Sequence, residues 1–168
     1  MALKKEYRKV KGAVVIPLAM LINNRKDLDW KKESELTEED LKLIREGILA
    51  SKWYDLGLVE KMANAAFKLI GKGRAEMAYE FGYALLKSAL DIYHTLLSKG
   101  VPENSLARFA NLYHATWFNT GEAKFIMTEK GGTFQIFDPD GIPFQESFAH
   151  MIKGVLAKIV EENKGENV

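Results

Sequence analysis

The chain has 168 residues, of which 47% are hydrophobic and 28% are charged. A chain of this length buries roughly 70% of its unfolded surface, so we expect one domain over residues 1–168, with flexible ends at 1–10 and 161–168. Because the formal net charge is only +1, the composition gives no electrostatic reason to expect nucleic acid as a partner. No uncharged run approaches the ~20 residues that a membrane helix requires, so no membrane span is expected.

The absence of cysteine excludes disulfides, thiolate zinc sites, iron–sulfur clusters and cysteine nucleophiles. A basic segment precedes the uncharged run 12–22, as it does in signal peptides. However, Pro17 interrupts this run, and Asn-Asn-Arg-Lys follows it in place of a small-residue cleavage site. The protein is therefore predicted to be cytoplasmic. Many Lys, Glu and Arg residues beside few glutamines lean toward the composition of a thermophile.

The N-terminal part begins with an ambiguous apolar segment. Residues 14–16 precede Pro17, and proline suits the first turn of a helix, so the segment is compatible either with a short strand or with the start of a short helix. The charged residues 25–36 have no periodic pattern and are predicted to form a surface loop, which the indole of Trp30 holds in place.

Two helices are predicted next along the chain. Thr37 supplies a capping hydroxyl, and the acidic residues that follow it suit the positive end of a helix dipole, so a helix should run from there to about Ser51. A second helix begins after Asp55, carries one apolar stripe and stops at the Gly-Lys-Gly turn 71–73.

The segment 74–99 has the widest apolar surface of the chain. Two apolar stripes run along it at helical spacing, which predicts one continuous central helix that is contacted from two sides. Gly82 lies inside this helix, where glycine costs roughly 1 kcal/mol relative to alanine. A close helix approach or a ligand at that point would explain the glycine, and neutral tolerance is the alternative.

The last third of the chain changes from helix to strand and back to helix. A helix is predicted over 104–119, an antiparallel hairpin over 123–128 and 133–138, and a final helix over 145–162. The expected fold class is therefore α+β and mostly helical, with a long central helix packed with other helices on a small antiparallel hairpin.

Short motifs for a chemical reaction are missing from the sequence. The chain has no Gly-x-Ser-x-Gly elbow, no Gly-x-x-x-x-Gly-Lys phosphate loop and no Gly-x-Gly-x-x-Gly dinucleotide motif. The three histidines, His94, His114 and His150, form no metal-binding pair at helical spacing. We therefore predict no metal site and name no catalytic residue.

Five short features resemble those of one ligand-binding superfamily. They are Lys11-Gly12 before an apolar run, Trp53-Tyr54 at the start of a helix, Gly82 in the long helix, 117–121 entering the hairpin, and 152–156 in the last helix. In this order they resemble the superfamily of haem-nitric-oxide-binding-type domains, 4-vinyl-reductase-type domains and subunits of the Golgi transport protein particle.

The resemblance implies a fold of helices packed on a small antiparallel sheet, often dimeric, whose interior can hold an apolar ligand. The Tyr-x-Ser-x-Arg motif of the haem-binding branch is absent, so no haem or other cofactor is expected. We expect a homodimer that meets through helices of the 55–99 region, because this region is rich in the large aromatic residues that interfaces favour.

The expected function is that of a non-catalytic binding or sensory module, which takes a small apolar ligand, a protein partner or both. The alternative is an enzyme whose site is assembled from dispersed carboxylates and histidines. The candidate ligand-binding residues are aromatic or lie on the central helix: Trp53, Tyr79, Gly82, Tyr83, Trp117 and Phe125.

Overall fold

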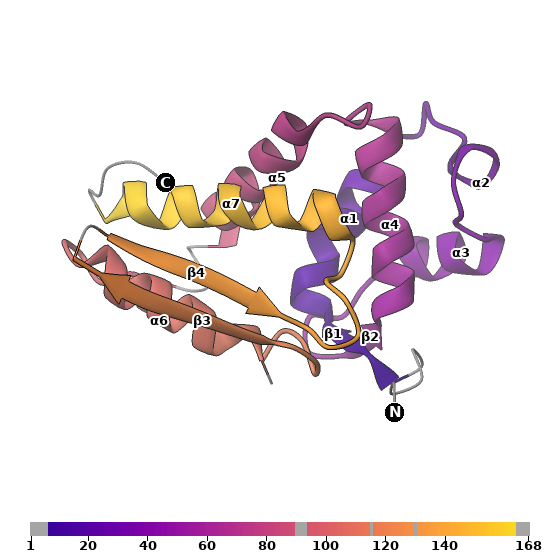
Figure 1. Ribbon diagram of the computed structural model, residues 1–168. Coiled ribbons are helices and arrows are strands. Elements are labelled where there is room, and N and C mark those ends of the chain that lie inside the picture. Colours follow the sequence, from indigo (N-terminus) through magenta and orange to yellow (C-terminus); the bar gives the residue numbers. More distant parts are fainter. Residues whose placement is uncertain (1–6, 90–93, 115, 130, 164–168) are drawn as a thin grey trace.

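The computed structural model describes residues 7–89, 94–114, 116–129 and 131–163, and these form an α+β fold (Figure 1). Helices dominate, and the strands form two antiparallel pairs, β1 with β2 and β3 with β4. None of the described helices is long and apolar enough to cross a membrane. The elements in chain order are β1 (Lys9–Lys11), α1 (Gly12–Asn24), α2 (Trp30–Glu33), α3 (Glu38–Glu46), β2 (Trp53–Asp55), α4 (Leu56–Leu69), α5 (Ala75–Ala89), the 3-10 helix η2 (His94–Leu96), α6 (Pro102–Tyr113), β3 (Glu122–Thr128), β4 (Gly131–Phe137) and α7 (Gln145–Glu162).

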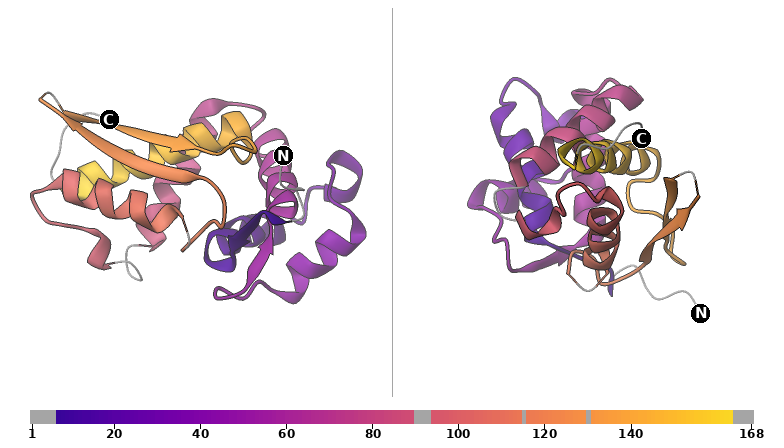
Figure 2. Two further views of the ribbon diagram at one scale, coloured as in Figure 1. Left: turned by 60° about the horizontal axis from the view of Figure 1, so that its bottom comes forward. Right: turned by 90° about the vertical axis from the view of Figure 1, so that its left-hand side faces the viewer.

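The elements form two groups (Figures 1 and 2). The elements from β1 to α4 lie together at one end, and α5, α6, the hairpin and α7 make up the other. The hairpin packs on α6, and α7 runs beside both α5 and α6. Strand β1 ties the groups together, because the Lys11 N–H donates a hydrogen bond to the carbonyl oxygen of Trp117 at 2.8 Å.

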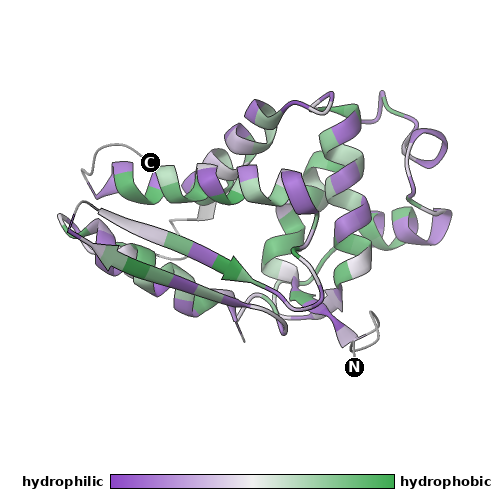
Figure 3. Cartoon of the chain, viewed as in Figure 1, coloured by the Kyte–Doolittle hydropathy of each residue, from purple (hydrophilic) through white to green (hydrophobic). Residues whose placement is uncertain are grey.

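The ambiguous N-terminal segment is a helix, α1, with Pro17 in its second turn. Most of this helix is apolar (Figure 3), and its buried side chains include Val15, Leu18 and Ile22. A helix that is apolar on nearly every side is stable only when other elements cover it. Helices α3 and α4 contact α1, so its burial, which local sequence does not reveal, decides between strand and helix.

The chain contacts distant segments from residue 8 onward. Arg8 is 3% exposed and donates from Nη2 to Asp138 Oδ2 at 2.9 Å and to the Gly141 carbonyl at 2.7 Å. A buried charge requires such partners, because desolvation otherwise costs several kcal/mol. Residues 1–6 and 164–168 lie outside the described residues, and flexibility there stays a prediction.

The expected loop 25–36 contains the short helix α2. Trp30 is buried as its first residue, and its indole Nε1–H donates to the Arg25 carbonyl at 3.0 Å. The indole therefore anchors this segment, as predicted.

Helix α3 begins as predicted and ends early. Thr37 Oγ1 accepts a hydrogen bond from the Asp40 N–H at 3.1 Å, and Asp40 Oδ2 accepts one from the Thr37 N–H at 2.9 Å, which completes a capping box. The predicted end near Ser51 is wrong. Gly47 follows Glu46 with φ +105°, a backbone conformation that stops the helix.

The central helix is also shorter than predicted. Helix α5 is described to Ala89, and residues 90–93 lie outside the described residues. Residues 94–96 form a 3-10 helix, so a continuous α-helix through residue 99 is wrong at its C-terminal end. The chain turns there toward α6: Gly100 has φ +78°, and the Ser98 N–H donates to Ser105 Oγ at 2.7 Å.

The C-terminal third follows its predicted order. The predicted hairpin and the predicted final helix, α7, are both confirmed. Earlier in the chain, α4 ends at Leu69, just before the predicted Gly-Lys-Gly turn. Helix α6 ends at Tyr113 instead of 119, because His114 adopts an extended backbone with φ −82° and ψ 143°. Trp117 therefore lies in the connection after the helix and not within it.

Two glycines allow α5 and α7 to cross at close range. A Cβ atom added at Gly82 would overlap the backbone carbonyl of Met151, and one added at Gly154 would overlap the carbonyl of Tyr79. Each helix therefore places a glycine against the backbone of the other. Of the explanations for Gly82, the structure supports the close helix approach.

We predict that Gly82→Ala lowers the free energy of unfolding by about 1 to 3 kcal/mol, because the methyl group forces the two helices apart. Helix propensity alone would instead raise stability by about 1 kcal/mol. Urea unfolding followed by circular dichroism measures the difference. The exposed Ala149 of α7 gives the control, since Ala149→Gly should lose only the propensity term. A Gly82→Ala variant more stable than wild type would contradict the close crossing.

Candidate functional site

A partly open cavity of about 520 Å³ lies between α1, α5, α6 and α7. Its wall is made of aliphatic and aromatic side chains, and no charged side chain among the described residues contributes to it. Of the described lining residues, only Tyr113 and Trp117 carry polar side-chain atoms. The lining includes Ala13, Pro17, Met20, Leu85, Leu86, Tyr113, Trp117, Phe118, Phe148, Met151 and Val155.

Helical spacing directs several of these side chains into the cavity. On α7, Phe148, Ile152 and Val155 are separated by one turn each and line the same wall. Phe109 and Tyr113, one turn apart on α6, line the facing wall. Adjacent helices thus turn their apolar stripes toward one space.

The connection after α6 closes the cavity with aromatic rings. The Tyr113 ring stacks on Phe118 with centroids 4.6 Å apart, and Phe118 meets the edge of Phe148 at 6.0 Å. Trp117 lies beside Phe109 at 5.1 Å. Rings packed in this way lose little conformational freedom when a ligand binds, so the wall is largely preformed.

Tyr113 carries a buried hydroxyl that has no hydrogen-bond partner within the described part of the chain. The residue is 1% exposed. Burial, and then the negative charge of Asp138, raise the pKa of the Tyr113 phenol above its usual range, while Arg8 opposes the shift. The phenol is therefore neutral at physiological pH, and its O–H is a buried donor.

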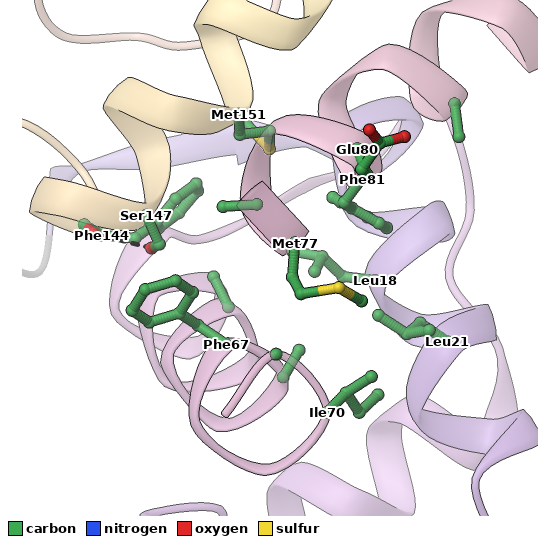
Figure 4. Close-up of a pocket in the computed structure, with 15 residues that line it drawn as sticks. Leu18, Leu21, Phe67, Ile70, Met77, Glu80, Phe81, Phe144, Ser147 and Met151 are labelled. Carbon is green, nitrogen blue, oxygen red and sulfur yellow. Dashed lines mark hydrogen bonds between the residues drawn. The ribbon is translucent and has the colours of Figure 1, made fainter. Parts of the chain in front are cut away.

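A second apolar cavity of about 370 Å³ lies between α1, α4, α5 and α7 (Figure 4). Met77 and Leu18 lie close together in it, with Phe67 and Ile70 on the α4 side. Its polar contributions are few. Ser147 Oγ already donates to the Phe144 carbonyl at 2.9 Å, and Glu80 on the exposed side of α5 supplies the one charged side chain among the described lining residues.

Of the predicted site residues, Trp117 lines the larger cavity. Tyr79, Gly82 and Tyr83 lie together on α5, where they face α7 at the glycine crossing. The Tyr83 hydroxyl donates to the Glu161 carboxylate, and the Lys158 Nζ lies 4.9 Å from the centre of the Tyr83 ring. These tyrosines thus join two helices of the same chain.

The remaining two predicted residues lie on separate elements. Trp53 is in β2, with Lys11 Nζ 4.3 Å from its ring centre. Phe125 is in β3, opposite Phe134, and its ring covers Gly132 on the neighbouring strand. Neither residue lines one of the two cavities.

Sequence reasoning missed α1 as a wall of both cavities, although its uncharged run was visible. It also missed Met151, whose position between the cavities depends on contacts with distant segments. Within the described ranges, no group of three His, Asp or Glu side chains could hold a metal ion. Contact of a partner chain with 55–99 stays a prediction.

The comparisons with known proteins identify a shared fold. No protein-family model matches the chain, and no curated protein matches it. A solved structure described as "Modulating Heme Redox Potential Through Protein-Induced Porphyrin Distortion" superimposes with a TM-score of 0.61. The alignment has 14% identity and covers 93% of this chain and 86% of the other. At this identity the likeness shows the fold alone.

We predict that Tyr113→Phe leaves the free energy of unfolding unchanged or raises it by about 1 to 3 kcal/mol, because it removes a buried hydroxyl that has no partner. Tyr54 is the matched control, since its buried hydroxyl accepts a hydrogen bond from the Leu49 N–H at 2.8 Å. Tyr54→Phe should therefore lose about 1 kcal/mol. Urea unfolding of both variants makes the comparison, and an equal loss in both would show that the Tyr113 hydroxyl is bonded.

Proposed function

We propose that the protein is a binding or sensory module that takes a small apolar ligand into the larger cavity, without catalysing a reaction. The observation that carries this proposal is the lining of the cavity: about 520 Å³ bordered by aliphatic and aromatic side chains, with no charged side chain among the described residues. Ligand sites in proteins have this size, this apolar character and a small number of placed polar groups.

The lining favours an uncharged ligand or an uncharged part of one. A charged group inside this cavity would lose its hydration without gaining a partner of opposite charge. Apolar surface buried there contributes about 25 cal/mol per Å².

The fold is shared with a structure studied for haem, so we asked whether this lining fits a haem. Among the side chains that the structure describes, no histidine lines either cavity. The raised pKa of Tyr113 disfavours the phenolate that would bind iron, and no described Lys or Arg side chain lines the larger cavity to pair with haem carboxylates. The described lining therefore does not fit a haem, and the proposal concerns an apolar ligand other than haem.

Filling the cavity should abolish binding. We predict that Ala13→Phe, which places a ring in the lining of α1, lowers the affinity for the neutral apolar dye N-phenyl-1-naphthylamine about tenfold or more, equivalent to at least about 1.4 kcal/mol. Fluorescence titration of the folded protein measures the affinity.

The matched control is Ala107→Phe, at an exposed position on α6 that lines neither cavity. This variant should bind the dye as wild type does. Equal dye binding by wild type and Ala13→Phe, with both folded, would place the apolar site elsewhere and contradict the proposal.

A further inference from the structure

The two apolar cavities are neighbours along the same helices. On α1, Pro17 lines the larger cavity and the next residue, Leu18, lines the smaller one. On α5, Ala84 lines the smaller cavity and Leu85 the larger. Among the described residues, Met151 of α7 is the one shared by the two linings. It therefore lies where the cavities come nearest to each other.

The backbone and the side chain of Met151 have different freedom. Its backbone carbonyl packs against Gly82 of α5, at a crossing too close for a Cβ atom, so the backbone cannot shift without separating the helices. Its side chain is unbranched, with three rotatable bonds, and can change rotamer within the space of either cavity. Any movement of Met151 is therefore a movement of its side chain and not of its backbone.

We propose that Met151 controls a passage between the two cavities, and that the protein accepts an unbranched apolar chain whose length is selected at this residue. This inference rests on the proposed function, since it extends the same site. A short chain occupies the larger cavity with Met151 in place. A longer chain displaces the Met151 side chain and continues between α1, α4 and α5 toward Met77.

The walls on both sides of Met151 suit such a chain. Leu18, Phe81 and Met77 continue the apolar surface beyond it (Figure 4). The exposed Glu80 supplies the charge of the second lining, and a carboxylate at that end would be repelled by it. The end of the ligand near Glu80 is therefore not a carboxylate.

The NMR signals of the methionine methyl groups show how far the alkyl chain of a bound alcohol extends. In protein labelled with ¹³C at the methionine methyls, 1-hexanol should shift the signals of Met20 and Met151, which line the larger cavity, and leave Met77 unchanged. The longer 1-decanol should shift all three signals. Met62 is fully buried and lines neither cavity, so its signal should stay constant throughout.

Affinity gives a second readout. While methylenes are being buried, each one adds about fourfold to the binding constant. In wild type this gain should continue from 1-hexanol to 1-decanol. In Ala84→Phe, which adds a ring to the lining of the second cavity, the gain should stop at a shorter chain while 1-hexanol binds as before. In Met151→Phe, whose rigid ring blocks the passage, the gain should also stop at a shorter chain. Met127→Phe, at an exposed position on the hairpin, should behave as wild type.

The outcomes separate this inference from the proposed function. If 1-hexanol binds but 1-decanol never shifts Met77, and the gain stops at the same length in wild type and both blocking variants, the passage does not exist and the proposed function stands. If no alcohol shifts Met20 or Met151, both are overturned. Thermal unfolding of each variant verifies folding, and Ala84→Phe decides the test if Met151→Phe does not fold.

Discussion

The close crossing of α5 and α7 is the constraint on which the rest of the structure depends. Gly82 and Gly154 each lie against the backbone of the opposite helix, so neither position has room for a side chain. Backbones this near leave the large side chains on either side of the crossing to pack against other helices. Leu85 and Leu86 of α5 and Phe148 of α7 extend toward α1 and α6, where the larger cavity is found.

The cavity is a consequence of how the two groups of elements are joined. The buried Arg8–Asp138 pair and the hydrogen bond from Lys11 to Trp117 hold β1 against the segments around α6 and the hairpin. Helix α1 follows β1 directly and is thereby placed beside α5 and α7. These contacts join the elements near their ends and leave a space between α1, α5, α6 and α7. Apolar side chains of these helices line that space.

Much of the fold could be predicted because its signals are local. The hydroxyl of Thr37, the glycines of the hairpin turn and the apolar stripe of α7 lie within the elements that they specify. The cavity could not be predicted from the sequence, since its walls come from segments far apart in the chain. Gly82 remained undecided because its partner lies on another helix, and of the aromatic candidates only Trp117 lines a cavity.

A crystal pressurised with xenon tests the central claim most directly, because xenon binds in apolar spaces that water does not fill. The account predicts xenon density in the larger cavity, in contact with Leu86, Phe148 and Val155. Ordered water molecules in that space, or side chains that close it, would contradict an apolar ligand site between α1, α5, α6 and α7.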